Sequence, residues 1–281
     1  MPHSNSNHPL RFGVITDIHF STESETAAAE ATAAEIGTCM ERWKNHNVDF
    51  LLQLGDLIKG SETHKREEFR QVSSILKAFR GTIRHVIGNH CLALPRRELM
   101  EALGLQSAYY TFTMQGFRFM VLDGMDVSVL STPETEEDRQ LLAHFHTHPE
   151  LHDYCGAVGS WQKAWLQKGL EEAEHRGEKV IIICHFPLLA ETTDQRHGLL
   201  WNHREIAELL VSSPAVKVCL SGHYHYGGYA QLNTLHFVVL PAFVNRNAHP
   251  RFTCGTVELT GERMVIRNQL DETLYDLPLR H

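Results

Sequence analysis

Short apolar-rich runs alternate along most of the chain with longer segments whose apolar side chains recur at helical spacing. The short runs lead directly into Gly, Asp, Ser or His residues, a pattern typical of buried strands that end in a loop. They occupy residues 10–16, 48–54, 82–87, 180–184 and 216–220. The helical segments occupy residues 23–45, 67–79, 95–103, 160–174 and 203–211. This alternation predicts a layered α/β domain with polar residues at the carboxyl ends of its strands.

The rest of the chain predicts further strands and one irregular insertion. A hairpin is expected at 109–122, and strand-like alternation covers 229–240 and 253–267. Residues 131–159 are acidic at first and then rich in histidine, which predicts a helix followed by a loop. A solvated insertion is favoured there over a direct catalytic role, although the segment could also act as a lid over a cleft. Ser160 is the expected N-cap of the helix that follows.

Composition narrows the class of protein. The chain has 281 residues, of which 42% are hydrophobic and 21% are charged, as in a soluble globular enzyme. Its formal charge of -8 argues against a partner that is a nucleic acid polymer, because binding to many phosphates needs a basic face. Residues 1–9 have no apolar core of the kind that a signal peptide needs, no apolar run reaches membrane-spanning length, and the six cysteines form no C-x-x-C pair. We therefore expect a reduced, cytoplasmic protein that does not span a membrane.

The domain organisation follows from the same pass along the chain. Residues 1–9 are polar and are predicted to be disordered. Residues 10–281 show neither an internal repeat nor a linker and are predicted to form a single domain, with the insertion or lid at 131–159.

Candidate chemistry lies just past five of the predicted strands. Along an extended chain, residues two apart point to the same side and lie about 6 to 7 Å apart, so Asp17 with His19 and His223 with His225 can face one cavity. The complete set of converging oxygen and nitrogen ligands is Asp17, His19, Asp56, Asn89, His185, His223 and His225. Seven ligands without a thiolate are too many for one four-coordinate zinc, so a pair of divalent ions is predicted. A carboxylate that touches both ions offsets their repulsion, and Asp56 is the candidate bridge.

Taken singly, each motif has a plainer explanation. A lone D-x-H or a histidine after a strand is more often structural than catalytic, and a Gly-Asp pair after a strand can be only a turn. Five such motifs in this order, each after a predicted strand, are difficult to obtain by chance.

These motifs resemble the ordered motifs of the calcineurin-like metallophosphoesterases over residues 12–228. The resemblance implies a four-layer αββα sandwich, in which two mixed β-sheets are flanked by helices. It assigns Asp17, His19 and His225 to one ion, assigns Asn89, His185 and His223 to the other, and makes Asp56 the bridge. It also implies that His90 gives a hydrogen bond or a proton to the phosphate or to the leaving oxygen. An acidic residue follows Gly-Asn-His in much of this superfamily, whereas this chain has Cys91, which is expected to pack rather than to act as a nucleophile.

A narrower resemblance extends to about residue 265. The segments around Pro95-Arg96, Leu122-Asp123, Trp201-Asn202 and Tyr224 look like the manganese-dependent ADP-ribose/CDP-alcohol diphosphatases. The animal members have Gln where this chain has His19. The resemblance implies manganese as the metal, with Fe, Zn or Co as alternatives. The candidate substrate-binding residues are Arg96, Asp123, Trp201, Asn202 and Tyr224.

The predicted function is a dimetal-dependent phosphohydrolase that cleaves the diphosphate linkage of small nucleoside diphosphate-linked substrates such as ADP-ribose and CDP-alcohols. Two cations lower the pKa of a shared water, so that hydroxide is available near neutral pH and no protein nucleophile is required. Asp56 and His90 are the predicted catalytic residues. The alternatives are a phosphodiesterase of cyclic nucleotides or other diesters, a non-catalytic binding module, and a histidine-rich metal buffer. The sequence leaves the oligomeric state open.

Overall fold

The computed structural model describes residues 8–23, 26–195 and 198–279, so almost all of the disordered segment predicted at 1–9 lies outside the described residues. The strands are β1 (Leu10–Ile15), β2 (Phe50–Gln53), β3 (Thr82–His85), β4 (Tyr110–Met114), β5 (Phe117–Leu122), β6 (Lys179–Cys184), β7 (Val216–Ser221), β8 (Gly228–Leu232), β9 (Leu235–Val239), β10 (Gly255–Leu259), β11 (Arg263–Arg267) and β12 (Thr273–Pro278). The α-helices are α1 (Thr26–Asn45), α2 (Lys65–Leu76), α3 (Arg96–Leu103), α4 (Glu136–His146), α5 (Ser160–Arg176) and α6 (His203–Ser212). Short 3-10 helices are η1 (His90–Ala93), η2 (Ala190–Thr192) and η3 (Phe243–Asn245).

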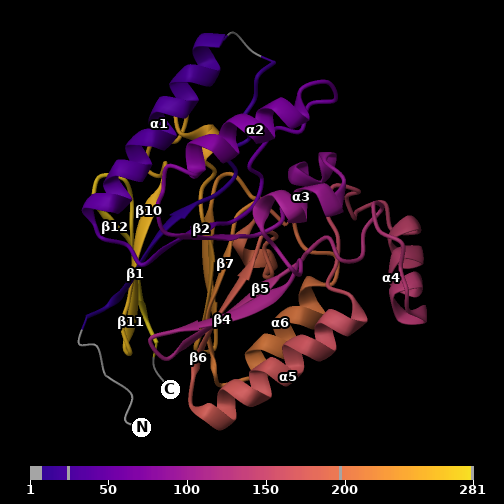
Figure 1. Cartoon of the computed structure of the whole chain (residues 1–281). Coiled ribbons are helices and arrows are strands. Elements are labelled where there is room, and N and C mark those ends of the chain that lie inside the picture. The colour runs from indigo at the N-terminus through magenta and orange to yellow at the C-terminus, as the bar shows by residue number, and fades with distance from the viewer. Residues whose placement is uncertain (1–7, 24–25, 196–197, 280–281) are drawn as a thin grey trace.

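The strands form two mixed sheets (Figure 1). The first has the order β12-β11-β10-β1-β2-β3, and its strands β1, β2 and β3 are parallel. The second has the order β4-β5-β6-β7-β9-β8, and its strands β5, β6, β7 and β9 are parallel. This architecture confirms the predicted class of two mixed sheets flanked by helices.

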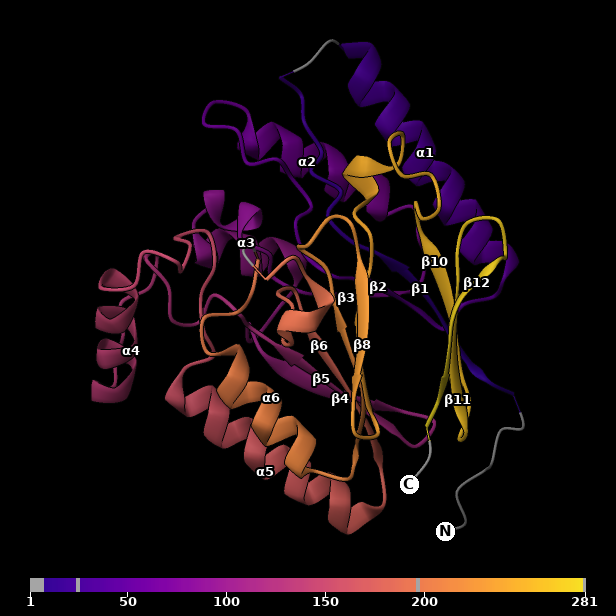
Figure 2. The same cartoon turned by 180° about the vertical axis from the view of Figure 1, so that it is seen from behind.

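Three apolar layers hold the molecule together. Between the sheets, Phe12 stacks on Phe50 with ring centroids 4.8 Å apart, and Phe112 stacks on Phe119 at 4.7 Å. Helices α1, α2 and α3 bury their apolar faces on the outer side of the first sheet, and α5 and α6 cover the second sheet (Figure 2). Because a helix or sheet is stable only when its apolar face is covered, this stacking fixes the order of the layers.

Two local features differ from the sequence-based expectation. Strand β12 was not predicted, because Asp276 and Pro278 interrupt its apolar pattern; it pairs with β11 at the edge of the sheet, where proline is tolerated. Ser160 is the first residue of α5 rather than its N-cap. The carboxylate of Asp138 in α4 accepts from the Ser160 backbone N–H at 2.8 Å instead, so a residue remote in sequence satisfies this helix end.

The loops that carry the candidate ligands extend the pairing of β1 with β2. Beyond the strand ends, the N–H of His19 donates to the Asp56 carbonyl at 3.0 Å, and the N–H of Phe20 donates to the Leu57 carbonyl at 3.0 Å. These backbone bonds hold the loop after β1 against the loop after β2.

Candidate dimetal centre

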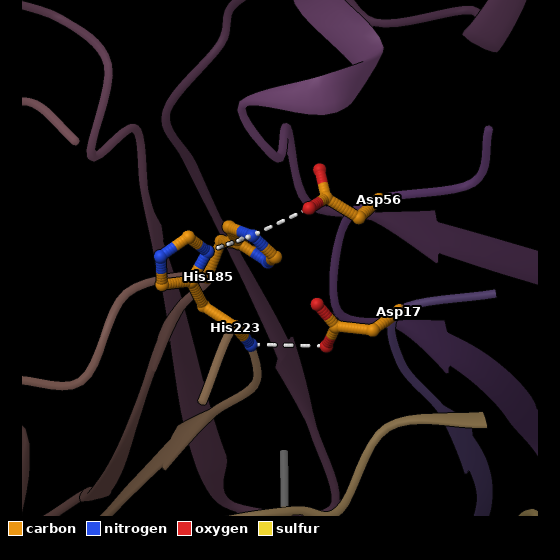
Figure 3. A group of neighbouring side chains, drawn as sticks. All are labelled: Asp17, Asp56, His185 and His223. Atoms are coloured by element: carbon orange, nitrogen blue, oxygen red, sulfur yellow. Dashed lines mark hydrogen bonds and ion pairs between the residues drawn. The ribbon is translucent and has the colours of Figure 1, made fainter. Parts of the chain in front are cut away.

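The seven predicted ligands lie together at the carboxyl ends of five strands that come from both sheets. Figure 3 shows Asp17, Asp56, His185 and His223 directed toward a common point. Asp17 and His19 follow β1, Asp56 follows β2, Asn89 follows β3, His185 follows β6, and His223 and His225 follow β7. The side-by-side carboxyl ends of parallel strands therefore supply the whole set.

The backbone at these positions is not extended, so that part of the sequence-based geometry is wrong. Asp17, His19, Asp56 and His223 have φ values of 50°, 46°, 52° and 64°. Non-glycine residues seldom occupy this left-handed region, and the cost of doing so is about 1 to 3 kcal/mol for each residue. Such strain persists only where the surroundings enforce it, as the backbone bonds between the two loops do here, and it gathers at functional sites.

Each aspartate presents one carboxylate oxygen that has no hydrogen-bond partner among the described residues. Oδ2 of Asp17 accepts from the N–H of His223 at 2.9 Å and from the Thr16 hydroxyl, while its Oδ1 is unpartnered. Oδ1 of Asp56 accepts from the N–H of His90 at 2.9 Å, while its Oδ2 is unpartnered. Leaving a buried polar atom unpaired costs about 1 to 3 kcal/mol, and more when the atom is charged. Two such oxygens among imidazoles fit a site for cations.

The spacing of the ligand atoms fits two ions. Atoms that bind one ion at about 2.1 Å lie about 3.0 to 3.5 Å from one another. Nε2 of His19 lies 3.1 Å from Nε2 of His225, and both face Oδ1 of Asp17 at 3.6 and 3.5 Å. This first group matches the set assigned to one ion.

The second group surrounds His185. Its Nδ1 donates to the Leu54 carbonyl at 2.8 Å, which leaves Nε2 free as a ligand atom. That Nε2 lies 3.2 Å from Nδ1 of His223 and 3.3 Å from Oδ1 of Asn89. Oδ2 of Asp56 is 3.3 Å from this Nε2 and 3.7 Å from Nε2 of His19, so it stands between the two groups. This position favours Asp56 as the bridge.

Charge in the site is balanced among buried groups. Burial opposes ionisation of Asp17 and Asp56, but nearby imidazoles hold the pKa of each carboxyl below its usual range. Burial likewise opposes protonation of His185, yet the negative charge of Asp56 raises the pKa of His185 to about 9. Burial and the charge of His185 lower the pKa of His223 to about 3. Since a metal ligand must be deprotonated, His185 would have to offer a proton-free Nε2 to hold a cation here.

Two glycines in the motifs permit close approach to the aspartates. A Cβ on Gly88 would lie 2.1 Å from Oδ1 and 2.4 Å from the backbone nitrogen of Asp56. A Cβ on Gly222 would lie 2.1 Å from the Thr16 hydroxyl oxygen and 2.6 Å from Oδ2 of Asp17. These glycines are needed because no side-chain atom fits between the loops.

His90 lies beside the ligands with its ring oriented by a backbone group. Its Nδ1 donates to the Lys59 carbonyl at 2.7 Å, and its ring packs edge-on against His19 with centroids 4.5 Å apart. The Lys59 carbonyl therefore takes the orienting role that a carboxylate after Gly-Asn-His would have. Cys91 is buried, its sulfur accepts from the N–H of Leu57 at 3.3 Å, and burial raises its pKa to about 12, so its thiol is not a nucleophile.

Replacement of His90 by alanine is expected to lower kcat by about 10- to 100-fold while metal content stays intact. This loss is at or below the low end of the range for general acids, because a phosphate leaves more easily than an alkoxide. Turnover and bound metal should be measured on the same preparation. Alanine at His64, an exposed histidine that precedes α2, is the matched control. Loss of metal from the His90 variant would make His90 a ligand and contradict this assignment.

The predicted substrate-binding residues lie farther out and mostly contact protein groups. Arg96 pairs with the buried carboxylate of Asp123 and donates to the Met125 carbonyl at 2.8 Å. It lines a separate cavity of about 430 Å³. The Asn202 amide bonds to the backbone N–H and carbonyl of Val158, at 3.1 and 2.9 Å.

Trp201 and Tyr224 differ in how open they are. The Trp201 ring is nearly buried and stacks on Phe145 with centroids 4.1 Å apart, whereas Tyr224 is partly exposed beside Tyr226. Direct substrate contact by the five residues remains a prediction. Sequence reasoning did not identify the Lys59 carbonyl, because a backbone group leaves no signal in residue type.

A fold of two mixed sheets with a dinuclear ligand set at the strand ends is that of the metallophosphoesterases. The chain belongs to the calcineurin-like phosphoesterase family, whose pattern matches residues 10–227. It is a metal-dependent hydrolase of this class, and the family is expected to hold two metal ions.

Two proteins with an assigned activity and one solved structure are similar to this chain over most of its length. The chain is 30% identical over 251 residues to a manganese-dependent ADP-ribose/CDP-alcohol diphosphatase from Arabidopsis thaliana, with 78% of this chain and 80% of the relative covered. It is 24% identical over 306 residues to the human protein of the same name, with 92% and 89% covered. A dimetal phosphatase from Danio rerio has the same fold with a TM-score of 0.82 at 24% identity, with 97% of this chain and 99% of that chain covered.

Proposed function

We propose that this protein is a manganese-dependent hydrolase of nucleoside diphosphate-linked small molecules such as ADP-ribose and CDP-alcohols. The observation that carries the proposal is the pair of unpartnered oxygens of Asp17 and Asp56 between two groups of imidazoles. The names of the relatives support the substrate class. Oxygen and imidazole ligands suit manganese, and Fe, Zn or Co are the alternatives.

The site residues have two proposed roles, metal binding and hydrogen bonding to the substrate. When bound, two divalent ions lower the pKa of water and offset phosphoryl charge. Asp17, His19 and His225 would hold one ion, and Asn89, His185 and His223 would hold the other, with Asp56 between them. His90, held by the Lys59 carbonyl, directs its Nε2 away from that bond and can give a hydrogen bond to a phosphoryl or leaving oxygen.

We propose that part of the 131–159 insertion walls the site and that α4 does not. The ring of Tyr154 lies 5.7 Å from that of His223, and the sulfur of Cys155 lies 3.9 Å from Nε2 of His223. Helix α4 lies at the periphery (Figure 1). Arg96, Asp123, Trp201 and Asn202 are proposed to hold the loops around this wall.

We also propose that residues 10–281 act as one domain in the cytoplasm. Within the described ranges, no helix combines the length and the apolar character that crossing a bilayer requires.

The test is a manganese-supplemented panel of ADP-ribose, CDP-choline, cyclic AMP and p-nitrophenyl esters. The proposal expects kcat/KM for the two diphosphates to exceed that for the other substrates by about tenfold or more, since extra binding groups on a substrate raise kcat/KM. A preference for cyclic AMP would establish the rival phosphodiesterase function. Preference for simple esters would overturn the diphosphatase assignment.

A further inference from the structure

A cavity of about 640 Å³ opens beside His90 and the first ligand group, and its volume suits a small-molecule site. The lining residues at the candidate metal centre are His19, His90 and His225. The residues that form the rim include Glu23, Lys59 and Asn245. Of the described residues that line this cavity, Lys59 alone is a lysine or arginine, although the chain carries a formal charge of -8. An anionic substrate group that does not bind the metal ions therefore has one lysine or arginine side chain to contact in this cavity.

The backbone of Lys59 is fixed relative to the catalytic residues. Its N–H donates to the Phe20 carbonyl at 3.0 Å, and its carbonyl accepts from Nδ1 of His90 at 2.7 Å. The segment that carries Lys59 is thus held against both the loop after β1 and the His90 ring. Because the Lys59 backbone is held in place, its side chain stays at the cavity rim, while rotation about its four-carbon chain lets the ammonium group change position.

The ammonium group of Lys59 pairs with Glu23, another rim residue, at 2.7 Å. The side chains are 55% and 38% exposed, so the pair lies in water. Exposed pairs of this kind contribute little to stability and break readily. An ammonium group that keeps its charge in such a pair can move to a phosphate at small cost.

We propose that Lys59 binds the second phosphate of a diphosphate substrate, the one that departs, and that Glu23 competes for the same ammonium group. This inference rests on the proposed diphosphatase function. Hydrolysis joins the oxygen of water to the attacked phosphorus and breaks the bond from that phosphorus to the bridging oxygen. The bridging oxygen leaves with the second phosphate, which becomes a dianion as one proton passes to solvent. Lys59 offsets this added negative charge.

The first test compares Lys59→Ala with wild type on ADP-ribose and on bis(p-nitrophenyl) phosphate, which has a single phosphate. Loss of a charge-assisted hydrogen bond predicts a fall in kcat/KM on the order of 10- to 100-fold for ADP-ribose, and less than about threefold for the single-phosphate ester. Lys59→Arg should recover most of the activity, because the charge is kept. Equal losses on both substrates would overturn the proposal, since they would indicate a general disturbance of His90.

Inhibition gives a readout without turnover. Lys59→Ala should weaken inhibition by α,β-methylene-ADP, which has two phosphates, about 10- to 100-fold and leave inhibition by AMP within about threefold. Glu23→Gln should strengthen inhibition by α,β-methylene-ADP, by about two- to fivefold. Lys44→Ala and Glu41→Gln alter a comparable exposed pair in the last turns of α1 and should change neither constant.

The outcomes separate the inference from the function on which it rests. If wild type does not hydrolyse ADP-ribose or CDP-choline, the proposed function fails. If wild type hydrolyses them, and Lys59→Ala keeps the wild-type kcat/KM for ADP-ribose and the wild-type inhibition by α,β-methylene-ADP, Lys59 has no role in binding the second phosphate. A matching loss in Lys44→Ala would assign the effect to overall charge rather than to the cavity rim.

Discussion

Replacement of Asp56 by alanine is expected to reduce manganese-dependent hydrolysis by at least about 1,000-fold in a protein that remains folded. Removal of a group that acts directly in the reaction typically lowers the rate by a factor of this size, and Asp56 lies between the two ligand groups. Its Oδ2 accepts no hydrogen bond from the described residues but faces Nε2 of His185 at 3.3 Å, so the substitution removes this ion pair and the bond from the His90 N–H to Oδ1. The backbone bonds between the loops after β1 and β2 remain, so the chain should still fold.

Metal binding distinguishes this role from a structural one. Wild type should bind manganese, and its melting temperature should rise with manganese concentration, because a ligand that binds only the folded state stabilises it. Asp56→Ala and Asp56→Asn should lose this rise and hold less metal, while circular dichroism stays unchanged. Asp276→Ala, which alters an exposed aspartate of β12, is the control and should match wild type. Retained activity in Asp56→Ala would refute the bridging assignment.

Gly88→Ala is expected to lower kcat/KM by about 100-fold or more through displacement of Asp56. The added methyl group would meet the backbone nitrogen of Asp56 at 2.4 Å, which no side-chain rotation relieves, and its Oδ1 at 2.1 Å, which can move away only by turning the carboxylate. A shift of about 1 Å at a catalytic group can cost this much activity. Overpacking should also reduce the free energy of unfolding, by about 1 to 3 kcal/mol.

The matched control for this substitution is Gly37→Ala in the middle of α1. A Cβ there meets no atom within 4 Å, so the change tests alanine for glycine without a clash. Since alanine favours helix over glycine, the free energy of unfolding should rise by about 0.5 to 1 kcal/mol with unchanged activity. Denaturant unfolding and steady-state kinetics on both variants provide the measurements. Wild-type activity in Gly88→Ala would show that the loops have room that the structure does not indicate.

Residue type and order along the chain were sufficient to predict the strands that carry the site and the seven residues that gather there. Each predicted ligand follows a predicted strand, and β1, β2 and β3 in one sheet and β6 and β7 in the other are parallel, so their carboxyl ends point the same way within each sheet. The pattern predicted less at the periphery, where β12 carries a charged residue and a proline. Edge strands bury fewer side chains, so their apolar signal is weak.

Only the tertiary structure decided the details on which chemistry depends. The left-handed backbone at Asp17 and Asp56, the carbonyl of Lys59 that orients His90, and the carboxylate of Asp138 at the start of α5 all follow from contacts between segments remote in sequence. The same holds for Lys59 and Glu23, which share a cavity rim although they are far apart along the chain. A single sequence records which side chains are present, whereas the energy of a hydrogen bond or a close approach depends on where folding places both partners.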